Sequence, residues 1–494
     1  MSGDWVARPP ALPSTSVMPT PVITIAQMRE WERATWATGV SEESVIRRAG
    51  AAVAQVARRL TRPGAEVLVL AGKGHNGDDA RFAAEGLTDR RVGVLNVTDP
   101  AAAVAEVKGF SGALIIDGLF GIGLSRPLAG EWLELVAAMN ASRVPILAVD
   151  VPSGLDADTG EPLGDAVRAT VTVTFGAMKR GLLRAEAAQF TGRLEVAADI
   201  GLVPCPFATE LNWTLPEDFA GFPPPRPVDG HKGTFGHLAI IAGSVGYHGA
   251  AVLAARGALR AMPGLVSVFT TPGAYPAVAA QLAQPMVHPW VEGTVLPKSC
   301  SAVLFGPGLV GMDVPEALRD ELVRLWRESP LPIIADASGL AWLPAGPVAE
   351  GALRVITPHP GEAAAMLGVT KSRVLEEREA VLRELSLSCG GAWVALKGRH
   401  TLVGRGRGEM FLNPSGNAGL AQGGSGDVLA GYLGGWLAQP RGRAEVALAI
   451  RHAVWAHGLA ADALSAHWRA WGMAELLGLL GEAVPPAFPV GERP

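Results

Sequence analysis

Continuous apolar segments alternate with alanine-rich, helix-like segments along almost the whole chain. The apolar segments are residues 66–70, 113–117, 145–150, 171–175, 237–242, 265–270, 302–305, 331–335, 353–357 and 393–396. An apolar run without polar alternation is typical of a strand that is buried on both faces, as in a parallel sheet between two layers of helices. The pattern therefore predicts an α/β fold.

The alternation stops between residues 201 and 229, where prolines occupy positions 204, 206, 216, 223–225 and 227. Proline lacks a backbone N–H group, so we expect neither a helix interior nor a central strand there. We place a Pro-rich linker at residues 206–228, between domains at 22–205 and 229–485, and two domains suit a chain of 494 residues. Residues 1–21 and 486–494 are expected to be tails, and the first lacks the apolar stretch of a signal peptide.

The composition excludes several classes of protein. Hydrophobic residues make up 49% of the chain and charged residues 18%, which is typical of globular domains. The net charge is −5 without a cluster of Lys and Arg, so we expect no nucleic acid and no membrane as partners. The three cysteines are far apart and follow no zinc-binding spacing, which predicts a cytoplasmic protein.

A glycine-rich segment at residues 417–427 precedes an apolar helix-like run in the C-terminal domain. Gly423, Gly424 and Gly426 allow a sharp turn with exposed N–H groups, and the following helix adds the positive end of its dipole. Asp427 falls in the first helical turn, where a carboxylate can take a proton from a hydroxyl that attacks a phosphoryl group. The alternative is an ordinary glycine-rich turn in which Asp427 only caps the helix.

Polar residues follow several other predicted strands of the same domain. Asp336 and Lys397 each come directly after an apolar run, and His359 lies between two prolines shortly before Glu362. Open α/β sheets bind ligands at the carboxyl ends of their strands, so we expect these residues to line one crevice. For His359, the alternative is a turn histidine with satisfied hydrogen bonds.

The order of these motifs resembles the ADP/ATP-dependent NAD(P)H-hydrate dehydratases, whose fold is ribokinase-like. The resemblance rests on Pro-His-Pro-Gly-Glu at 358–362 followed by Gly-Gly-Ser-Gly-Asp at 423–427. It implies that ADP or ATP, with Mg²⁺, phosphorylates the hydroxyl of hydrated NADH or NADPH, that Asp427 is the base, and that loss of phosphate restores the cofactor. The implied hydrate contacts are Ala250, Gly308, His359 and Asp427, and the implied nucleotide contacts are Lys397, Gly398, Arg399, His400, Thr401 and Gly426.

The N-terminal domain carries a second set of strand-end motifs. The apolar run 66–70 leads into a glycine-rich turn at 71–79, and two further runs end at Asp117 and Asp150 before glycine-rich loops. Carboxylate, amide and hydroxyl oxygens at such positions can bind a hard cation, and Asp150 can instead transfer protons. The alternative is a set of ordinary turns without chemistry, or a binding module without catalysis.

This second set resembles the NAD(P)H-hydrate epimerases, which implies a Rossmann-like three-layer α/β/α sandwich over about residues 24–202. The resemblance implies K⁺ bound by Asn76, Asp117 and Ser153, with Asp150 as a catalytic residue near the reacting centre. It implies a hydrate held by two loops, which consist of His75, Asn76, Gly77, Asp78 and Asp79, and of Gly121, Ile122, Gly123, Leu124, Ser125, Arg126 and Pro127. The first loop departs from the family pattern Asn-Asn-Gly-Gly-Asp-Gly, because Asp78 replaces a glycine. A negative charge near the substrate phosphates predicts a weakened epimerase.

The remaining expectations are less specific. Trp31 and Trp36 follow a helical pattern and are predicted to pack in a core, and His452 and His457 are predicted to be packing or surface residues rather than metal ligands. We expect a homo-oligomer. The rival function is a kinase of a sugar or vitamin alcohol with a non-catalytic N-terminal binding domain.

Overall fold

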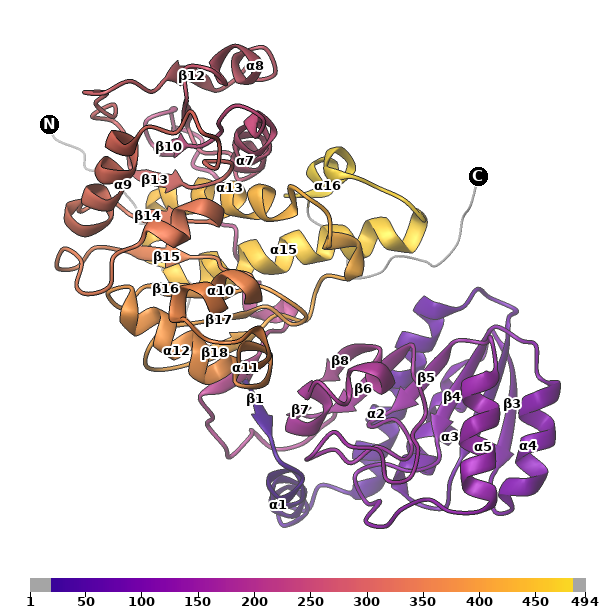
Figure 1. Cartoon of the computed structure of the whole chain (residues 1–494). Coiled ribbons are helices and arrows are strands. Elements are labelled where there is room, and N and C mark those ends of the chain that lie inside the picture. Colours follow the sequence, from indigo (N-terminus) through magenta and orange to yellow (C-terminus); the bar gives the residue numbers. More distant parts are fainter. Residues whose placement is uncertain (1–18, 483–494) are drawn as a thin grey trace, which may run out of the picture.

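The structure, a computed structural model, describes residues 19–482 and shows two α/β domains (Figure 1). The N-terminal domain contains a six-stranded parallel sheet with the strand order β3-β2-β4-β5-β6-β8. Its strands are β2 (Glu66–Ala71), β3 (Arg91–Asn96), β4 (Leu114–Gly118), β5 (Ile146–Val149), β6 (Val171–Phe175) and β8 (Arg193–Ala197). The predicted α/β class is confirmed.

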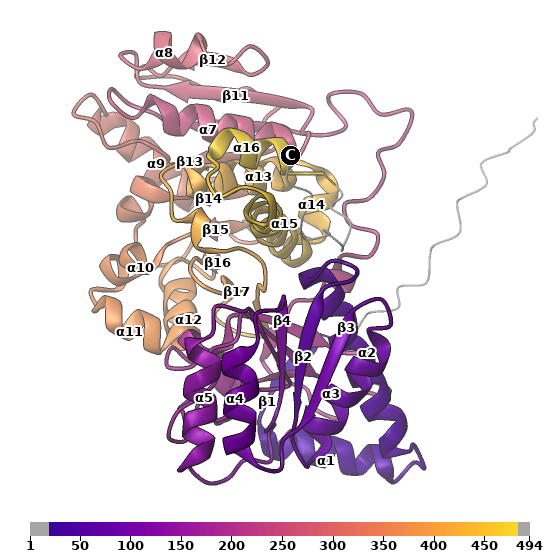
Figure 2. The same ribbon diagram turned by 90° about the vertical axis from the view of Figure 1, so that its right-hand side faces the viewer.

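Helices cover both faces of this sheet, as Figure 2 shows. One face packs against α2 (Glu42–Leu60) and α3 (His75–Gly86), and the other against α4 (Pro100–Gly109) and α5 (Glu131–Ala141). Successive residues of a strand point to opposite faces, so Val69 and Leu70 belong to different core clusters. Helix α1 (Ile25–Trp36) precedes this sandwich, and its Trp31 is buried as predicted, whereas Trp36 is half-buried.

The C-terminal domain contains a larger sheet whose central part is parallel. The parallel strands, in spatial order, are β12 (Met286–Pro289), β11 (Leu265–Thr270), β10 (His237–Ile241), β13 (Ala302–Phe305), β14 (Ile333–Ala335), β15 (Arg354–Ile356) and β16 (Trp393–Leu396). Two antiparallel strands, β17 (Leu402–Gly404) and β18 (Met410–Leu412), extend this sheet. Most of the apolar runs in the sequence thus form strands.

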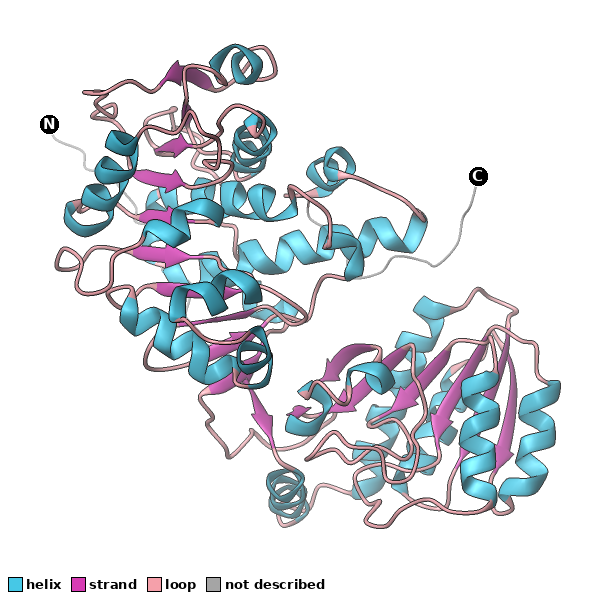
Figure 3. Ribbon diagram, in the orientation of Figure 1, coloured by secondary structure: helices cyan, strands magenta, loops and turns pink. Residues whose placement is uncertain are grey.

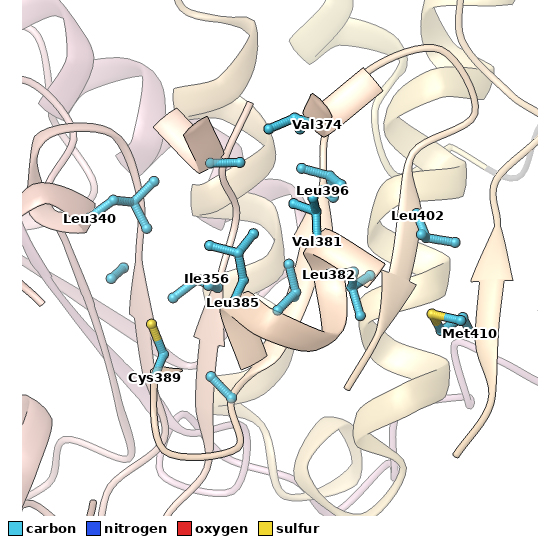
Figure 4. Close-up of a cluster of buried hydrophobic side chains, with 14 of the residues drawn as sticks. Leu340, Ile356, Val374, Val381, Leu382, Leu385, Cys389, Leu396, Leu402 and Met410 are labelled. Carbon is cyan, nitrogen blue, oxygen red and sulfur yellow. The ribbon is translucent and has the colours of Figure 1, made fainter. Parts of the chain in front are cut away.

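Helices lie on both faces of the larger sheet (Figure 3). One layer contains α7 (His248–Arg260), α13 (Ser425–Ala438) and α15 (Val446–His467), and the other contains α9 (Glu316–Glu328), α10 (Pro360–Leu367) and α12 (Arg378–Ser388). Figure 4 shows apolar side chains of α12, among them Leu382 and Leu385, packed against Ile356 and Leu396 of the sheet. Shorter helices are α6 (Ala188–Thr191), α8 (Tyr275–Ala279), α11 (Lys371–Glu376), α14 (Pro440–Ala444) and α16 (Met473–Leu479).

Helix α13 is the element that places the glycine-rich segment. From Val428 to Ala438 all its side chains are buried, because it lies against both α7 and α15. A Cβ atom on Gly431 would lie only 1.9 Å from the backbone oxygen of Ala254 in α7, so the two helices approach at a distance that glycine alone permits. This close packing fixes the start of α13 at the edge of the sheet.

The segment 206–228 differs from the expected linker. Its residues Leu211–Trp213 form strand β9, which pairs with β18 on one side and with β1 (Thr20–Ile23) on the other, and β1 in turn pairs with β7 (Met178–Lys179). The expectation that this proline-rich segment contains no central strand is wrong, because the prolines flank the three residues that pair. Residues 19–21 of the expected N-terminal tail are part of the described structure, whereas residues 1–18 and the expected tail at 486–494 lie outside it.

The structure also describes the two histidines of α15, the possible metal-binding clusters and the longest apolar helices. His452 and His457 are both buried in α15, and burial lowers the pKa of each to about 4, so they pack as neutral side chains. Residues 19–482 contain no cluster of three or more His, Cys, Asp or Glu side chains that could hold a metal ion. Among the helices in the same range, none is long and apolar enough to cross a membrane.

Candidate functional site

Four charged side chains meet at the carboxyl ends of the strands in the C-terminal domain. Asp336 follows β14, Lys397 follows β16, Glu362 lies in the first turn of α10 and Asp427 in the first turn of α13. The Nζ atom of Lys397 is 2.9 Å from Oδ1 of Asp336 and 3.9 Å from Oε2 of Glu362. The hydroxyl of Thr357 donates a 2.7 Å hydrogen bond to the same oxygen of Asp336. The sheet therefore brings together residues from four separate sequence motifs.

The glycine-rich segment brings a helix N-terminus to this cluster. Gly424 has a φ of +94°, a left-handed conformation that side chains other than that of glycine rarely adopt, and α13 begins at the next residue. A Cβ atom on Gly426 would lie 3.3 Å from the Nζ atom of Lys397. Free N–H groups, the positive end of the helix dipole and an ammonium group thus converge, and this combination attracts phosphate.

Asp427 is placed where its protonation can change near neutral pH. Burial, together with the nearby carboxylate of Asp336, raises the pKa of Asp427 to about 6, although Lys397 opposes the rise. Burial by itself would lower the pKa of Lys397, but the carboxylates of Asp336 and Glu362 raise it, so the ammonium stays charged. A group with a pKa near the working pH is suited to general-base catalysis.

His359 caps helix α10 through one of its two ring nitrogens. Its Nδ1 atom accepts hydrogen bonds from the backbone N–H groups of Gly361 at 3.0 Å and Glu362 at 3.1 Å. The Glu362 carboxylate returns the contact by accepting the N–H of His359 at 2.7 Å. The capping interaction places the ring proton on Nε2. The side chain is 57% exposed, so Nε2 can donate to a ligand in the crevice.

A cavity of about 830 Å³ lies beside the cluster. The implied nucleotide contacts line it together: Lys397, Gly398, Arg399, His400, Thr401 and Gly426, with His359 at the same cavity. His400 is a special case, because it adopts a φ of +51° and its ring meets that of Trp213 edge-on at 5.2 Å. Burial and the nearby charges of Arg399 and Arg378 lower the pKa of His400 to about 3, so its ring is neutral.

Ala250 and Gly308, the other two hydrate contacts that the family resemblance implies, lie next to each other. A Cβ atom on Gly308, which has a φ of +66°, would lie 2.8 Å from the Cβ atom of Ala250. Ala250 lies in the first turn of α7, and Gly308 lies in the loop after β13. Within residues 19–482, Ala250 and Gly308 lie outside the lining of the 830 Å³ cavity. They therefore mark a different part of the same edge of the sheet.

The N-terminal domain has a cavity of about 540 Å³ at the carboxyl ends of β2, β4 and β5. Strand β2 pairs with β3 along one of its edges and with β4 along the other, so the order of the strands reverses at β2. The cavity therefore lies at a topological switch point. The lining includes many of the predicted residues, namely His75, Asn76, Asp79, Gly121, Ile122, Gly123, Leu124, Ser125, Arg126 and Asp150. Of the described residues in the two loops, Gly77, Asp78 and Pro127 lie outside that lining.

Asp78 does not occupy the position that the sequence argument gave it. The segment 75–79 forms the first turn of α3, and successive side chains of a helix point in different directions. The Asp78 carboxylate pairs with Arg81 at 2.7 Å and is 43% exposed. Asp79 faces the cavity instead, and burial together with Asp150 and Asp78 raises its pKa well above the usual range. The expected repulsion between Asp78 and bound phosphates therefore has no support in the geometry.

Asp117 and Ser153 form a buried oxygen-rich group beside this cavity. The two side chains share a 2.6 Å hydrogen bond, and the backbone N–H of Ser153 donates to the other carboxylate oxygen at 2.9 Å. Burial raises the pKa of Asp117 to about 6, and the described residues offer it no ion pair. Asn76 lies close by, since its Oδ1 atom would be 3.1 Å from a Cβ atom on Gly121. Carboxylate, hydroxyl and amide oxygens are the ligand types that a hard cation takes.

Asp150 is held by a lysine that the sequence argument did not identify. The Nζ atom of Lys179 is 2.8 Å from Oδ1 of Asp150, 2.9 Å from the hydroxyl of Thr174 and 2.7 Å from the backbone oxygen of Phe175. Asp150 has a φ of +62°, an unusual conformation for a residue with a side chain. Glu32 of α1 also lines the cavity, and burial and Asp150 raise its pKa. Neither Lys179 nor Glu32 belongs to a recognisable motif.

Comparison with known proteins relates both domains to characterised families. The family model described as NAD(P)H-hydrate dehydratase matches residues 238–480, and the model described as YjeF-related protein N-terminus matches residues 42–108 and 95–181. The ADP/ATP-dependent NAD(P)H-hydrate dehydratase of Bacillus subtilis, co-crystallised with ATP and Mg²⁺, is 29% identical and covers 52% of this chain and 91% of its own, with a TM-score of 0.45.

Curated relatives match this chain over most of its length. The bifunctional NAD(P)H-hydrate repair enzyme of Coxiella burnetii is 35% identical over 88% of this chain and 93% of its own length. The enzyme with the same description from Gloeobacter violaceus is 36% identical over 92% and 96%. Because the similarity runs through both domains and spans nearly the whole of these relatives, the chain belongs to the family of bifunctional NAD(P)H-hydrate repair enzymes.

Proposed function

We propose that the C-terminal domain dehydrates the S form of hydrated NADH or NADPH at the expense of ADP or ATP. The observation that carries this proposal is the position of Asp427, whose pKa of about 6 suits a base, at a helix N-terminus beside Lys397. Asp427 takes the proton of the substrate hydroxyl as the oxygen attacks the terminal phosphoryl group. The phosphate ester then loses phosphate together with a proton from the adjacent ring carbon, which leaves the ring double bond of the reduced cofactor.

The surrounding groups hold the phosphates during this transfer. The N–H groups at the start of α13 and the ammonium of Lys397 stabilise the negative charge that develops on the phosphoryl oxygens. Asp336 and Glu362 keep Lys397 in place and charged. Mg²⁺ accompanying the nucleotide would supply further positive charge, and the carboxylates of Asp336 and Glu362 are the side chains that would hold it.

We also propose that the N-terminal domain interconverts the R and S forms of the hydrate. The buried pair of Asp150 and Lys179 opens onto a cavity that Asp79 also faces, so proton donors and acceptors surround the substrate ring. The ammonium of Lys179 lies 2.8 Å from Oδ1 of Asp150 and orients this carboxylate, which can accept a proton. K⁺ bound by Asn76, Asp117 and Ser153 would compensate the buried charge of Asp117.

Three free thiols support the proposed cytoplasmic location.

One experiment tests both halves of the proposal. Purified protein is mixed with separated R or S hydrate of NADH, with and without ADP or ATP, and the return of reduced-cofactor absorbance is followed. We expect nucleotide-dependent recovery from the S form at once and from the R form through epimerisation. The kinase alternative is not favoured, because the similarity to bifunctional repair enzymes covers both domains. Accumulation of a stable phosphorylated product would support that alternative instead.

Replacing His359 with alanine is expected to raise the KM for the hydrate about tenfold and to leave ADP affinity nearly unchanged, because the Nε2 donor is lost. Alanine also removes the cap of α10, which costs about 1 kcal/mol of stability. His359→Asn is the matched control, since asparagine restores the cap but not the Nε2 donor. Steady-state kinetics and calorimetric titration with ADP measure the two effects. Equal losses for both ligands in His359→Asn would contradict the assignment.

Replacing Asp78 with asparagine is expected to change the R-to-S conversion rate by less than about threefold. The carboxylate pairs with Arg81 at the surface, and an exposed ion pair contributes about 0–1 kcal/mol. The rate is measured by chromatography of the two hydrate forms. A rate in the variant of at least about ten times the original rate would show that Asp78 reaches the bound phosphates.

A further inference from the structure

The cavity proposed to bind the nucleotide is not formed by the C-terminal domain alone. Gly192, Arg193 and Leu194 line it together with Lys397–Thr401 and the 413–417 loop. These three residues belong to the N-terminal domain, where Gly192 follows α6 and Arg193 and Leu194 begin strand β8. The turn 191–194, which we call the interdomain turn, therefore forms part of the wall of a site in the other domain.

The interdomain turn is attached to the C-terminal domain by a polar contact. The Nη2 atom of Arg399 donates to the hydroxyl of Thr191 at 2.8 Å and to the backbone oxygen of Gly192 at 3.1 Å. Arg378 supports Arg399 by donating a 2.6 Å hydrogen bond to its backbone oxygen. Arg399 itself lines the cavity, so one side chain both faces the nucleotide site and holds the turn.

The interdomain turn is also fixed within its own domain. Thr191 is fully buried, and its backbone oxygen accepts a hydrogen bond from Thr172 at 2.8 Å. Gly192 has a φ of +57°, and a Cβ atom there would lie 2.2 Å from the backbone oxygen of Thr170. The turn is thus a rigid extension of the N-terminal sheet, and a rigid wall can position a ligand.

Arg193 lies toward one end of the cavity. The Asp462 carboxylate accepts hydrogen bonds from the N–H of Gly416 and the side chain of Asn417, each at 2.9 Å, and all three residues line the cavity. Arg193 lines the same cavity, and its guanidinium pairs with the carboxylate of Glu195. Lys397 and Gly426 mark the phosphoryl-transfer end, whereas Arg193 directly follows Gly192, whose backbone oxygen Arg399 contacts.

We propose that the N-terminal domain completes the nucleotide site, with Arg193 as a positioning residue for the base and ribose of ADP or ATP. Arg399 donates hydrogen bonds to the interdomain turn and so keeps this turn next to the nucleotide. The inference rests on the function proposed for the C-terminal domain. It implies that loss of Arg193 raises the KM for nucleotide and leaves kcat unchanged, because the contact is equally strong before and during phosphoryl transfer.

The experiment uses the full chain and measures the Kd of ADP by calorimetry, together with KM and kcat for ADP and ATP. Arg193→Ala is expected to weaken ADP binding about tenfold, with kcat within about twofold of the original value. Thr191→Val, which removes one of the two acceptors of Arg399 in the interdomain turn, is a second variant and is expected to weaken binding about threefold. Arg180→Ala is the control, because Arg180 pairs with Glu379 across the same two domains and lies outside the described cavity lining.

The outcomes separate this inference from the proposed function. Unchanged ADP affinity in both Arg193→Ala and Thr191→Val would overturn the inference while repair activity continued. An equal loss in Arg180→Ala would also overturn it, because the effect would then belong to the interface in general. If the original protein bound ADP but repaired no hydrate, the proposed function would fail. A selective loss of ADP affinity in Arg193→Ala would still support a contribution of the N-terminal domain to the nucleotide site.

Discussion

Replacing Asp427 with asparagine is expected to slow hydrate dehydration by about 10²–10⁴-fold, the usual contribution of a general base. Asparagine keeps the size of the side chain and the first turn of α13, so the phosphate-binding N–H groups stay in place. We therefore expect the Kd of ADP to change little. Single-turnover recovery of reduced-cofactor absorbance measures the chemical step, and calorimetry measures the binding of ADP. A variant with more than half of the original rate would exclude Asp427 as the base.

The pH dependence of the same reaction gives an independent check. Only the ionised carboxylate can accept the hydroxyl proton, and burial beside Asp336 raises the pKa of Asp427 to about 6. The value of kcat/KM for the hydrate should therefore fall about tenfold for each pH unit below about 6 and level off above it. In Asp427→Asn this low-pH limb should disappear. A limb that persists in the variant would come from another group.

Replacing Asp150 with asparagine is expected to slow the interconversion of R and S hydrates by about 10²–10⁴-fold. Asparagine tolerates the φ of +62° at this position, so the backbone is preserved. The amide cannot accept the proton that the ionised carboxylate accepts. The rate is measured by chromatography of the two hydrate forms without nucleotide, so the dehydratase does not contribute. Dehydration of the pure S form should continue at the original rate and serves as the internal control.

Loss of Asp150 also leaves the buried ammonium of Lys179 without its counter-charge, which can destabilise the domain. The double variant Asp150→Asn with Lys179→Met removes both charges and should restore the melting temperature without restoring epimerisation. Recovery of epimerase activity in the double variant would mean that the single variant failed through instability and that Asp150 is not the proton acceptor.

Much of the local structure follows from the sequence alone. The largely apolar runs at 171–175, 265–270, 302–305 and 393–396 form strands with those same limits, because short runs rich in β-branched and apolar residues and free of charge favour buried strands. The polar residues after them, such as Lys397, meet at one edge because parallel strands all end there. The glycine-rich start of α13 was likewise predictable, since a left-handed turn requires glycine at position 424.

The tertiary structure decided the features that depend on contacts between distant segments. Leu211–Trp213 became a strand because β18 and β1 offer backbone partners on both sides, which outweighs the surrounding prolines. Asp78 and Asp79 are adjacent in sequence, yet a helical turn directs one to Arg81 and the other to the cavity. Lys179 and Arg193 carry no motif, and only the tertiary structure places one against Asp150 and the other in the lining of the 830 Å³ cavity. A sequence pattern records local periodicity and turn chemistry, whereas the direction of a side chain depends on the partners that the folded chain brings to it.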